Sequence, residues 1–296
     1  MNKIRVCVVG YGNVGKEAAM CIRQAPDMEL AGLVRRNPED PGLGCPVVTS
    51  VEQLGKVDVA VLATPSRQVP TIAPQYLKKG INTVDSFDIH GDPLMNLHRD
   101  LDACAKEHGS VAIMSAGWDP GTDSVIRALF MAMAPRGLTY TNFGPGMSMG
   151  HTVAVKAIPG VRNALSMTLP AGFGKHKRDV YIELEDGANF EEVAAAIKKD
   201  PYFVNDETRV TRVDRVADVE AMGHGVSLER YGGCGSAENQ TLELKMRLCN
   251  PSATAQVLVS AARATTRQRP GAYALIEVPP VDLLPGDREK LLHDLV

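Results

Sequence analysis

Six residues near the start of the chain have the types and the spacing to hold a phosphate group. Gly10-Tyr11-Gly12-Asn13-Val14-Gly15 follows the apolar run Ile4–Val9 and opens a stretch with helical spacing. In such a turn the first glycine permits the tight bend, the second lets the backbone approach a pyrophosphate, and the third lets the helix pack closely on the strand. The first turn of the helix then presents N–H groups and the positive end of its dipole to the phosphates. The strand-to-helix context therefore predicts a dinucleotide site rather than an ordinary turn.

The end of the second expected strand distinguishes between the two nicotinamide cofactors. An Asp or Glu at this position binds the ribose 2′-hydroxyl of NAD, but here the sequence is Leu33-Val34-Arg35-Arg36. A carboxylate would repel a 2′-phosphate, whereas a guanidinium donates forked, charge-assisted hydrogen bonds to one. We therefore predict NADP as the cofactor, in preference to the alternative that Arg35 and Arg36 are only solvated surface residues.

Two further turns are expected to complete the cofactor site. They follow the next two strands and contain Thr64-Pro65-Ser66 and Asp85-Ser86. Ligands of open α/β sheets bind beyond the carboxyl ends of the strands, which is where both turns lie.

Two acidic residues lie at strand ends where a substrate would meet the nicotinamide. Asp88 follows the strand that ends at Asp85, and Asp119 follows the strand that ends at Ser115. Carboxylates in this place would suit an ammonium group better than an anion. They are the candidate catalytic residues and the candidates for the proton acceptor. The alternative for each is the role of a turn or helix-cap residue.

These residues need a scaffold, and the first 118 residues supply one. Short apolar runs alternate with helical stretches, and several runs lack polar alternation, as parallel strands covered on both faces do. The expected strands are Ile4–Val9, Glu29–Val34, Asp58–Ala63, Ile81–Asp85 and Ser110–Ser115. The expected helices are Val14–Gln24, Arg67–Lys78 and Pro93–His108. This βαβα order predicts a Rossmann-type doubly wound parallel sheet.

The pattern changes after Trp118, where strand-like runs become dominant. The expected strands are Leu138–Phe143, Leu165–Leu169, Asp179–Leu184, Thr208–Val213, Val226–Arg230 and Gln240–Leu248. The expected helices are Thr122–Ala134, Phe190–Lys199 and Pro251–Arg267, the last with Asn250 as its N-cap. The fold class is therefore α/β, with a Rossmann-type doubly wound parallel sheet and a second α+β domain built on a largely antiparallel sheet. We expect the dinucleotide-binding domain at residues 1–118, rejoined by about 270–296, and the substrate domain at 119–269.

Composition and charge exclude several classes of protein. The 296 residues are 44% hydrophobic and 23% charged, with a net charge of −3, which is ordinary for a globular protein with room for two cores. A protein that neutralises nucleic-acid phosphates needs a basic excess, and none is present, so we predict no nucleic-acid partner. No apolar run reaches the roughly 20 residues that span a bilayer, so we predict no membrane partner.

The six cysteines are scattered and form no CxxC pair, so the sequence predicts neither a disulfide framework nor a metal site. Free thiols fit a reducing cytosol. The first strand begins at Ile4, with no charged region, apolar region and cleavage site before it. We therefore expect no secretory signal and a cytoplasmic location.

Several longer segments resemble the meso-diaminopimelate dehydrogenase family, over essentially the whole chain. The most specific are Gly117-Trp118-Asp119-Pro120-Gly121 and Gly144-Pro145-Gly146. The others are Val9–Gly15, Pro26-Asp27-Met28, Thr83–Ser86, Gly150-His151, Ile158–Val161 and His176-Lys177-Arg178. The stretch between Thr168 and Arg178 is short, which resembles the compact subtype of the family, without an insertion found in other members.

The resemblance implies an NADP-dependent enzyme that oxidises the D-configured amino centre of meso-2,6-diaminopimelate. Hydride passes to NADP, and hydrolysis of the imine gives ammonium and L-2-amino-6-oxopimelate, which cyclises to tetrahydrodipicolinate. The reverse reaction is a reductive amination that feeds lysine and peptidoglycan precursors. The family also suggests at least a homodimer, formed through the strand-rich domain.

The resemblance assigns residues to both ends of this substrate. Around the reacting D-centre it places Asp88, Trp118, Asp119 and Met149. Around the distal L-centre and its carboxylate it places Phe143, Thr168, Arg178, His224 and Asn250. Four of these residues have plainer alternatives in the sequence: Trp118 in the core, Arg178 at the surface, His224 in a loop and Asn250 as a helix cap alone. His151 is expected to be structural.

Two other functions stay open on the sequence. One is another NADP oxidoreductase of similar build, such as a dihydrodipicolinate reductase or a homoserine dehydrogenase, which would lack the Gly-Trp-Asp-Pro-Gly segment. The other is a non-catalytic NADP-sensing protein, against which the intact Asp88, Asp119 and Arg178 argue. No lysine lies in a motif like that of the glutamate-type amino-acid dehydrogenases. The mechanism is therefore expected to depend on positioning and on the two aspartates.

Overall fold

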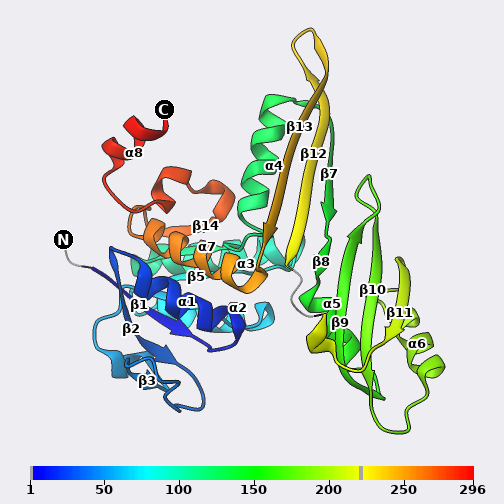
Figure 1. Ribbon diagram of the computed structural model, residues 1–296. Coiled ribbons are helices and arrows are strands. Elements are labelled where there is room, and N and C mark those ends of the chain that lie inside the picture. The colour runs from blue at the N-terminus through cyan, green and yellow to red at the C-terminus, as the bar shows by residue number, and fades with distance from the viewer. Residues whose placement is uncertain (1–2, 220–222) are drawn as a thin grey trace. The chain divides into compact units, whose positions relative to one another are not determined.

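The computed structural model describes residues 3–219 and 223–296, apart from the side chain of Met149. These residues form two compact units (Figure 1). Unit 1 contains residues 1–128 and 251–296, and unit 2 contains residues 129–250. Both boundaries differ from those expected after residues 118 and 269.

Helix α7 (Asn250–Thr265) explains the difference at the second boundary, because it was expected in the substrate domain. Its small apolar residues, including Ala255, Leu258 and Ala262, are fully buried in a core cluster of unit 1. The chain then adds strand β14 (Gly271–Ala274) to the edge of the same sheet. Helix α7 begins at Asn250 itself, one residue before the expected start.

Unit 1 is built on a seven-stranded parallel sheet with the strand order β14-β6-β5-β4-β1-β2-β3. Its strands are β1 (Ile4–Val9), β2 (Met28–Val34), β3 (Val47–Val48), β4 (Val59–Leu62), β5 (Asn82–Asp85), β6 (Val111–Met114) and β14. Strand β1 pairs with both of its neighbours, since Val8 pairs with Leu33 of β2 and with Val61 of β4. The strand order reverses between β1 and β4, which creates the switch point where such sheets bind ligands.

Helices cover both faces of this sheet. They are α1 (Asn13–Gln24), α2 (Val69–Leu77), α3 (Asp92–His108) and α7. Helix α4 (Thr122–Met133) leads from unit 1 into unit 2, and the exposed helix α8 (Arg288–Leu295) lies near the C-terminus. On β1, Val6 and Val8 lie in one core cluster with residues of α1 and α7, whereas Cys7 and Val9 lie in another with residues of α2 and α3. Successive strand residues point to opposite faces, so this burial explains the apolar runs without alternation. The predicted doubly wound α/β sheet is confirmed.

Unit 2 contains two sheets, with the strand orders β11-β10-β9-β8 and β13-β12-β7. Its strands are β7 (Arg136–Phe143), β8 (Gly146–Met147), β9 (Val161–Pro170), β10 (His176–Leu184), β11 (Glu207–Arg212), β12 (His224–Cys234) and β13 (Ala237–Leu248). Its complete helices are α5 (Met149–Lys156) and α6 (Phe190–Lys199). Every strand pair is antiparallel except β10 with β11. The largely antiparallel α+β domain is confirmed, with two sheets where one was expected.

Several short elements were not expected from the sequence. They are β3, β8 and β14, the helices α5 and α8, and the 3₁₀ helices η1 (Val51–Leu54), η2 (Ser66–Gln68), η3 (Val216–Asp218), η4 (Leu275–Glu277) and η5 (Pro280–Leu283). Strands of two to four residues are too short to show a periodic pattern. Within the described residues, no helix could cross a membrane and no cluster of three metal-binding side chains occurs.

Candidate functional site

The glycine-rich turn between β1 and α1 has the geometry of a phosphate site. Gly10 has a φ of +91°, and a Cβ placed on it would lie 2.6 Å from the carbonyl oxygen of Ala63. A Cβ on Gly15 would lie 2.3 Å from the carbonyl oxygen of Gly10, so both glycines are required by the packing of the protein itself. Gly12 differs, because a Cβ there would meet nothing within 4 Å. The space above Gly12 is thus open to a ligand at the N-terminus of α1.

The electrostatics of this turn favour an anion. Gly12 is the N-cap of α1, and the first turn of that helix contains no acidic residue that could occupy its free N–H groups. Tyr11 is half-buried and lies under Arg35, whose Cζ is 5.7 Å from the centroid of the tyrosine ring. Asn13 is exposed and Val14 is half-buried against the unit 1 core.

Arg35 and Arg36 follow β2 as expected. Arg35 is half-buried, and its only side-chain hydrogen bond to a described residue is a long one of 3.4 Å to the carbonyl oxygen of Glu39. Arg36 is exposed. Within the described chain neither guanidinium forms an ion pair, so both keep their donors for a phosphate. These residues fit the predicted cofactor.

The turn Thr64-Pro65-Ser66 after β4 lies beside the glycine turn. The Cγ2 atom of Thr64 would be 3.3 Å from a Cβ on Gly10, and the buried Oγ1 atom of Thr64 has no hydrogen-bond partner among the described residues. Pro65 is exposed. The hydroxyl of Ser66 accepts a hydrogen bond of 3.3 Å from the backbone N–H of Asp88. This turn therefore links the expected cofactor site to the first of the two candidate acids.

Asp85 joins the turns that follow β5 and β6. Its carboxylate is fully buried and accepts hydrogen bonds from the backbone N–H groups of Phe87 at 2.9 Å and Ser115 at 3.4 Å. Burial raises the pKa of Asp85 to about 6. The neighbouring Ser86 lies against the turn at Gly117. The enclosed Asp85 side chain holds the two turns together, and its expected contact with the cofactor stays a prediction.

Asp88 and Asp119, together with Trp118, form the reacting-centre cluster of unit 1. Asp88 is exposed and Asp119 is half-buried. The pKa of Asp119 is raised to about 7, first by burial, then by the charge of Asp123 and a hydrogen bond to it, and to a smaller extent by the charge of Asp88. The Trp118 side chain is only 4% exposed, and its carbonyl oxygen accepts hydrogen bonds from the first turn of α4. A carboxyl that titrates near neutral pH can exchange a proton with a substrate.

Asp123 and Arg127 support Asp119, and the sequence analysis missed both. The Asp123 side chain is fully buried at the start of α4, and its Oδ2 atom is 2.6 Å from Nη2 of Arg127, one helical turn further on. The spacing of four residues from Asp123 to Arg127 was a usable signal, because both lie on α4 and residues four apart on a helix are neighbours.

Arg178 and Thr168, with Phe143 and His224, form the distal cluster of unit 2. Arg178 and Thr168 are directly paired across β10 and β9, and the Nη1 group of Arg178 donates a hydrogen bond to the Thr168 hydroxyl. Arg178 also forms an ion pair with Asp206, with 2.6 Å between Nε and Oδ2. Its side chain is 11% exposed, so the alternative of an ordinary surface arginine is wrong. Asp206 was missed because it lies in a turn without any motif.

Three rings of unit 2, those of Phe143, His176 and His224, lie close to one another. The Phe143 ring centroid lies 5.6 Å from that of His176 and 6.3 Å from that of His224. The pKa values of His176 and His224 are lowered, mainly by burial, and the positive charge of Arg178 lowers both further. The Nδ1 atom of His224 is 2.7 Å from the carbonyl oxygen of Met147, so this nitrogen donates and Nε2 is left as the acceptor of a neutral ring.

His151 has contacts that agree with the structural role expected for it. Its Nδ1 atom is 2.8 Å from the Ser148 hydroxyl, and its ring makes edge contacts with Tyr202 and Phe203 at 5.2 Å each. Burial and the charge of Arg178 lower its pKa to about 4. Asn250 begins α7, as described above. The side chain of Met149, expected near the reacting centre, lies outside the described part of the chain.

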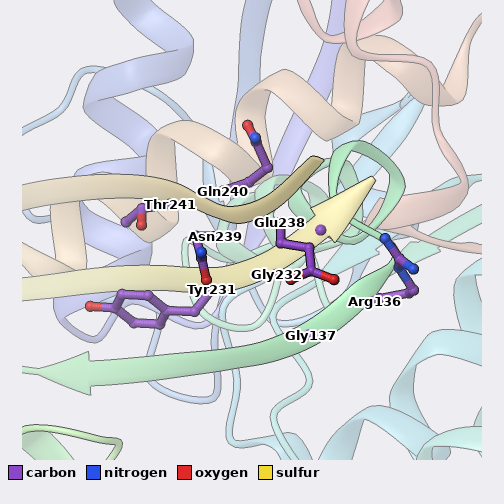
Figure 2. A pocket seen from close by; sticks show the side chains of 9 residues that line it. Arg136, Gly137, Tyr231, Gly232, Glu238, Asn239, Gln240 and Thr241 are labelled. Atoms are coloured by element: carbon purple, nitrogen blue, oxygen red, sulfur yellow. The ribbon is translucent and has the colours of Figure 1, made fainter. Parts of the chain in front are cut away.

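A surface pocket of about 540 Å³ lies elsewhere in unit 2, at the turn between β12 and β13 (Figure 2). Its walls include Arg136, Gly137, Tyr231, Gly232 and Glu238. A Cβ on Gly137 or Gly232 would come within 2.1 Å of a carbonyl oxygen on the neighbouring strand. These glycines therefore serve strand pairing, and none of the predicted site residues lines this pocket.

Comparisons with known proteins extend the similarity over both units. Two family models match, the diaminopimelic acid dehydrogenase C-terminal domain at residues 117–174 and the CoA binding domain at residues 1–88. The meso-diaminopimelate D-dehydrogenase of Bacteroides fragilis is 57% identical over 300 residues, which cover 100% of both chains. The solved structure of C. glutamicum DAP dehydrogenase in complex with DAP matches with a TM-score of 0.88 and 32% identity, over 100% of both chains. An engineered D-amino acid dehydrogenase bound to NADP+ matches with a TM-score of 0.81 and 32% identity, again over 100% of both chains.

Proposed function

The chain belongs to the meso-diaminopimelate dehydrogenase family, and from that premise we propose how its residues carry out the reaction. The protein is an oxidoreductase that deaminates the D-centre of meso-2,6-diaminopimelate oxidatively. The products are L-2-amino-6-oxopimelate, which cyclises to tetrahydrodipicolinate, and ammonium, and the reaction is reversible. The observation that carries the assignment of roles is the Asp119 carboxyl, which titrates near neutral pH at a strand end of the nucleotide-binding unit.

The cofactor is NADP, and the residues of unit 1 fit it. The open space at Gly12 and the N-terminus of α1 suit the pyrophosphate, while Arg35 and Arg36 suit the 2′-phosphate. The Thr64 hydroxyl beside the glycine turn has no hydrogen-bond partner among the described residues, so it offers one further hydrogen-bonding group. Bound NADP supplies the hydride acceptor for the oxidation.

The reacting-centre cluster handles the ammonium group and its proton. The exposed carboxylate of Asp88 attracts the ammonium of the D-centre. Asp119, in its ionised form, accepts a proton from that nitrogen as the carbon is oxidised and the C=N bond forms, and in the reverse direction it returns the proton. A pKa of about 7 suits both directions, because efficient acid–base catalysis needs a group that titrates near the working pH.

The distal cluster anchors the other end of the same substrate. The guanidinium of Arg178 has donors left after its bonds to Asp206 and Thr168, and these can hold a carboxylate by charge-assisted hydrogen bonds. The neutral ring of His224, held by its hydrogen bond to the Met147 carbonyl oxygen, contributes a polar group to the same end of the substrate. Recognition at this end is what would confine oxidation to one of the two amino centres.

Side-by-side measurement of NADP reduction with meso-, L,L- and D,D-diaminopimelate tests this function. We expect the meso isomer to react and the L,L isomer to be inert, because only a D-centre presents its Cα–H correctly. NADPH oxidation that does not depend on ammonium would instead indicate a reductase of the dihydrodipicolinate or homoserine type. Absence of turnover with all three isomers, in a protein that still binds NADP, would indicate an NADP-sensing protein.

We further propose that the protein is a homodimer in the cytoplasm. Unit 2 exposes an apolar surface in which Leu138 is 64%, Phe173 74% and Tyr231 44% exposed, around an edge contact of Tyr140 with Phe173. Exposed apolar patches of this kind commonly mark protein interfaces. The free cysteines of the described chain fit a reducing compartment. Light scattering at micromolar concentration gives the oligomeric state, and a Phe173→Glu variant is expected to shift it toward the monomer.

A further inference from the structure

The turn before β11 brings an acidic side chain to the arginine of the distal cluster. Asp206 Oδ2 is 2.6 Å from Arg178 Nε, and the two side chains are 22% and 11% exposed. The two residues are 28 positions apart in the sequence. No motif contains Asp206, and none of the roles proposed above involves it.

The pairing decides which donors of Arg178 are left for a ligand. A guanidinium has five N–H donors in a rigid fork. Asp206 occupies Nε and the Thr168 hydroxyl occupies one donor of Nη1, so the remaining donors are on the two terminal nitrogens. A carboxylate approaching Arg178 therefore cannot use the side of the fork that includes Nε. The donors that remain for it are on Nη1 and Nη2.

Asp206 is itself held in place by its backbone. Its N–H donates to the carbonyl oxygen of Phe203 at 3.0 Å, and its carbonyl oxygen accepts from the Thr208 hydroxyl at 3.1 Å. The Phe203 side chain is 1% exposed in a core cluster of unit 2, and Thr208 pairs directly with Arg178 across β11 and β10. The carboxylate thus projects from a turn that is fixed to the core at one side and to the strand of Arg178 at the other.

We propose that Asp206 is a positioning residue that orients the Arg178 guanidinium for the distal carboxylate of the substrate, an inference that rests on the proposed function. Asp206 fixes the plane of the fork before substrate arrives, which reduces the conformational entropy lost on binding. It also balances the charge of Arg178 in a weakly exposed place, where an unpaired guanidinium would be costly. Asp206 therefore sets the affinity for the far end of the substrate and leaves the chemistry at the D-centre unchanged.

The test compares Asp206→Ala and Asp206→Asn with wild type and with Asp179→Ala. Asp179 provides a matched control, because it lies on β10 one residue beyond Arg178 and forms an ion pair with Arg209 of β11 at 3.4 Å. For Asp206→Ala we expect the KM for meso-diaminopimelate to rise roughly ten-fold or more, the size typical of losing a group that orients a ligand-binding residue. The kcat and the KM for NADP should stay close to wild type. Asp206→Asn should raise the KM less, since the amide oxygen still accepts from Nε.

Thermal unfolding, measured for every variant, separates positioning from a structural role. If Asp206 only stabilised its turn, kcat and both KM values would change together with the unfolding temperature, and Asn would give no partial rescue. A KM within about two-fold of wild type in both Asp206 variants, or an equal rise in Asp179→Ala, overturns the proposal. If Asp206→Ala does not fold, the nearly isosteric Asp206→Asn decides alone, because a wild-type KM in that variant also overturns the proposal. Inactivity of the wild type on meso-diaminopimelate would instead refute the proposed function.

Discussion

The reacting-centre cluster of unit 1 and the distal cluster of unit 2 both depend on a charged residue that a second charged side chain supports. In unit 1, Asp119 lies beside Asp123, a group of the same charge type, and burial together with this neighbour raises its pKa to about 7. In unit 2, Arg178 lies beside Asp206, a group of opposite charge. The like pair creates a site that gains and loses protons near neutral pH, whereas the opposite pair creates a site of fixed charge.

The histidines of unit 2 strengthen this contrast. Burial and the positive charge of Arg178 lower the pKa values of His151, His176 and His224 below 6.5. A histidine with a lowered pKa is neutral at physiological pH. We therefore propose proton transfer at the reacting-centre cluster and recognition at the distal cluster. Substitutions in the reacting-centre cluster should change kcat and its pH dependence, and substitutions in the distal cluster should change KM.

The largest effect is expected for Asp119→Asn. The amide keeps the shape of the carboxyl but cannot accept the proton, so kcat should fall by about 10²- to 10⁴-fold, the usual contribution of an acid–base group. NADP binding, followed by fluorescence quenching, should stay intact. A variant with near-normal turnover would return Asp119 to the role of a turn residue and would remove the basis of the comparison.

Arg178→Ala should have the next largest effect and should act mainly on KM. Truncating one partner of a desolvated ion pair costs roughly 2–5 kcal/mol, which corresponds to a loss of about 30- to 4,000-fold in kcat/KM for meso-diaminopimelate. A small substrate such as D-alanine has no distal carboxylate for Arg178 to hold, so any activity on it should change far less. The decisive quantity is the ratio of the two efficiencies in wild type and variant. An unchanged ratio would show that Arg178 is not the distal anchor.

The sequence predicted the elements and motif residues of both clusters better than the groups that support them. The strand Ile4–Val9 and the helix Phe190–Lys199 match the structure residue for residue, because each has a long periodic or uniformly apolar pattern. Asp119 and Arg178, the central residues of the two clusters, lie in segments whose resemblance to the family is visible in the sequence. Asp206 could not be predicted, since it meets Arg178 only through the parallel pairing of β10 with β11 in a mostly antiparallel domain.

The assignment of α7 shows a second limit of the sequence. Its helical pattern was correct, but a helix pattern does not say which core receives the helix. The preceding strand β13 is in unit 2, and only the burial of residues such as Leu258 shows that α7 belongs to unit 1. Asp123 is an intermediate case. Its spacing from Arg127 was visible, but an acidic residue in the first turn of a helix also has an ordinary role in stabilising the helix dipole.

The predicted 2′-phosphate site of unit 1 is another site of fixed charge, because it depends on the guanidinium groups of Arg35 and Arg36. Arg35→Ala combined with Arg36→Ala should raise the KM for NADP by roughly ten- to a hundred-fold, because each charge-assisted hydrogen bond is worth about 1.5–3 kcal/mol and both residues are partly exposed. The KM for NAD should barely change, which makes NAD the internal control. Equal use of NADP and NAD by the unmodified protein would contradict the assignment of the two arginines.

The smallest effect, and the sharpest test of the contrast, is the pH dependence of Asp123→Asn. Oxidation needs the ionised form of Asp119, so with a pKa of about 7 the wild-type rate should fall as the pH drops through 7.

In Asp123→Asn, removing the negative charge of Asp123 removes one cause of the raised pKa of Asp119, and Arg127 then acts on Asp119 without that neighbour. Both changes lower the pKa of Asp119, so the acid limb of the kcat profile should move to lower pH, on the order of one unit. The variant should thus be relatively more active at pH 6 than wild type, although loss of the ion pair between the buried Asp123 and Arg127 should lower its unfolding temperature. The corresponding unit 2 variant, Asp206→Asn, should leave the acid limb where it is. A shift of the same size in both variants would mean that the limb reports a general change of charge, and an unmoved limb in Asp123→Asn would mean that Asp119 is not the titrating group.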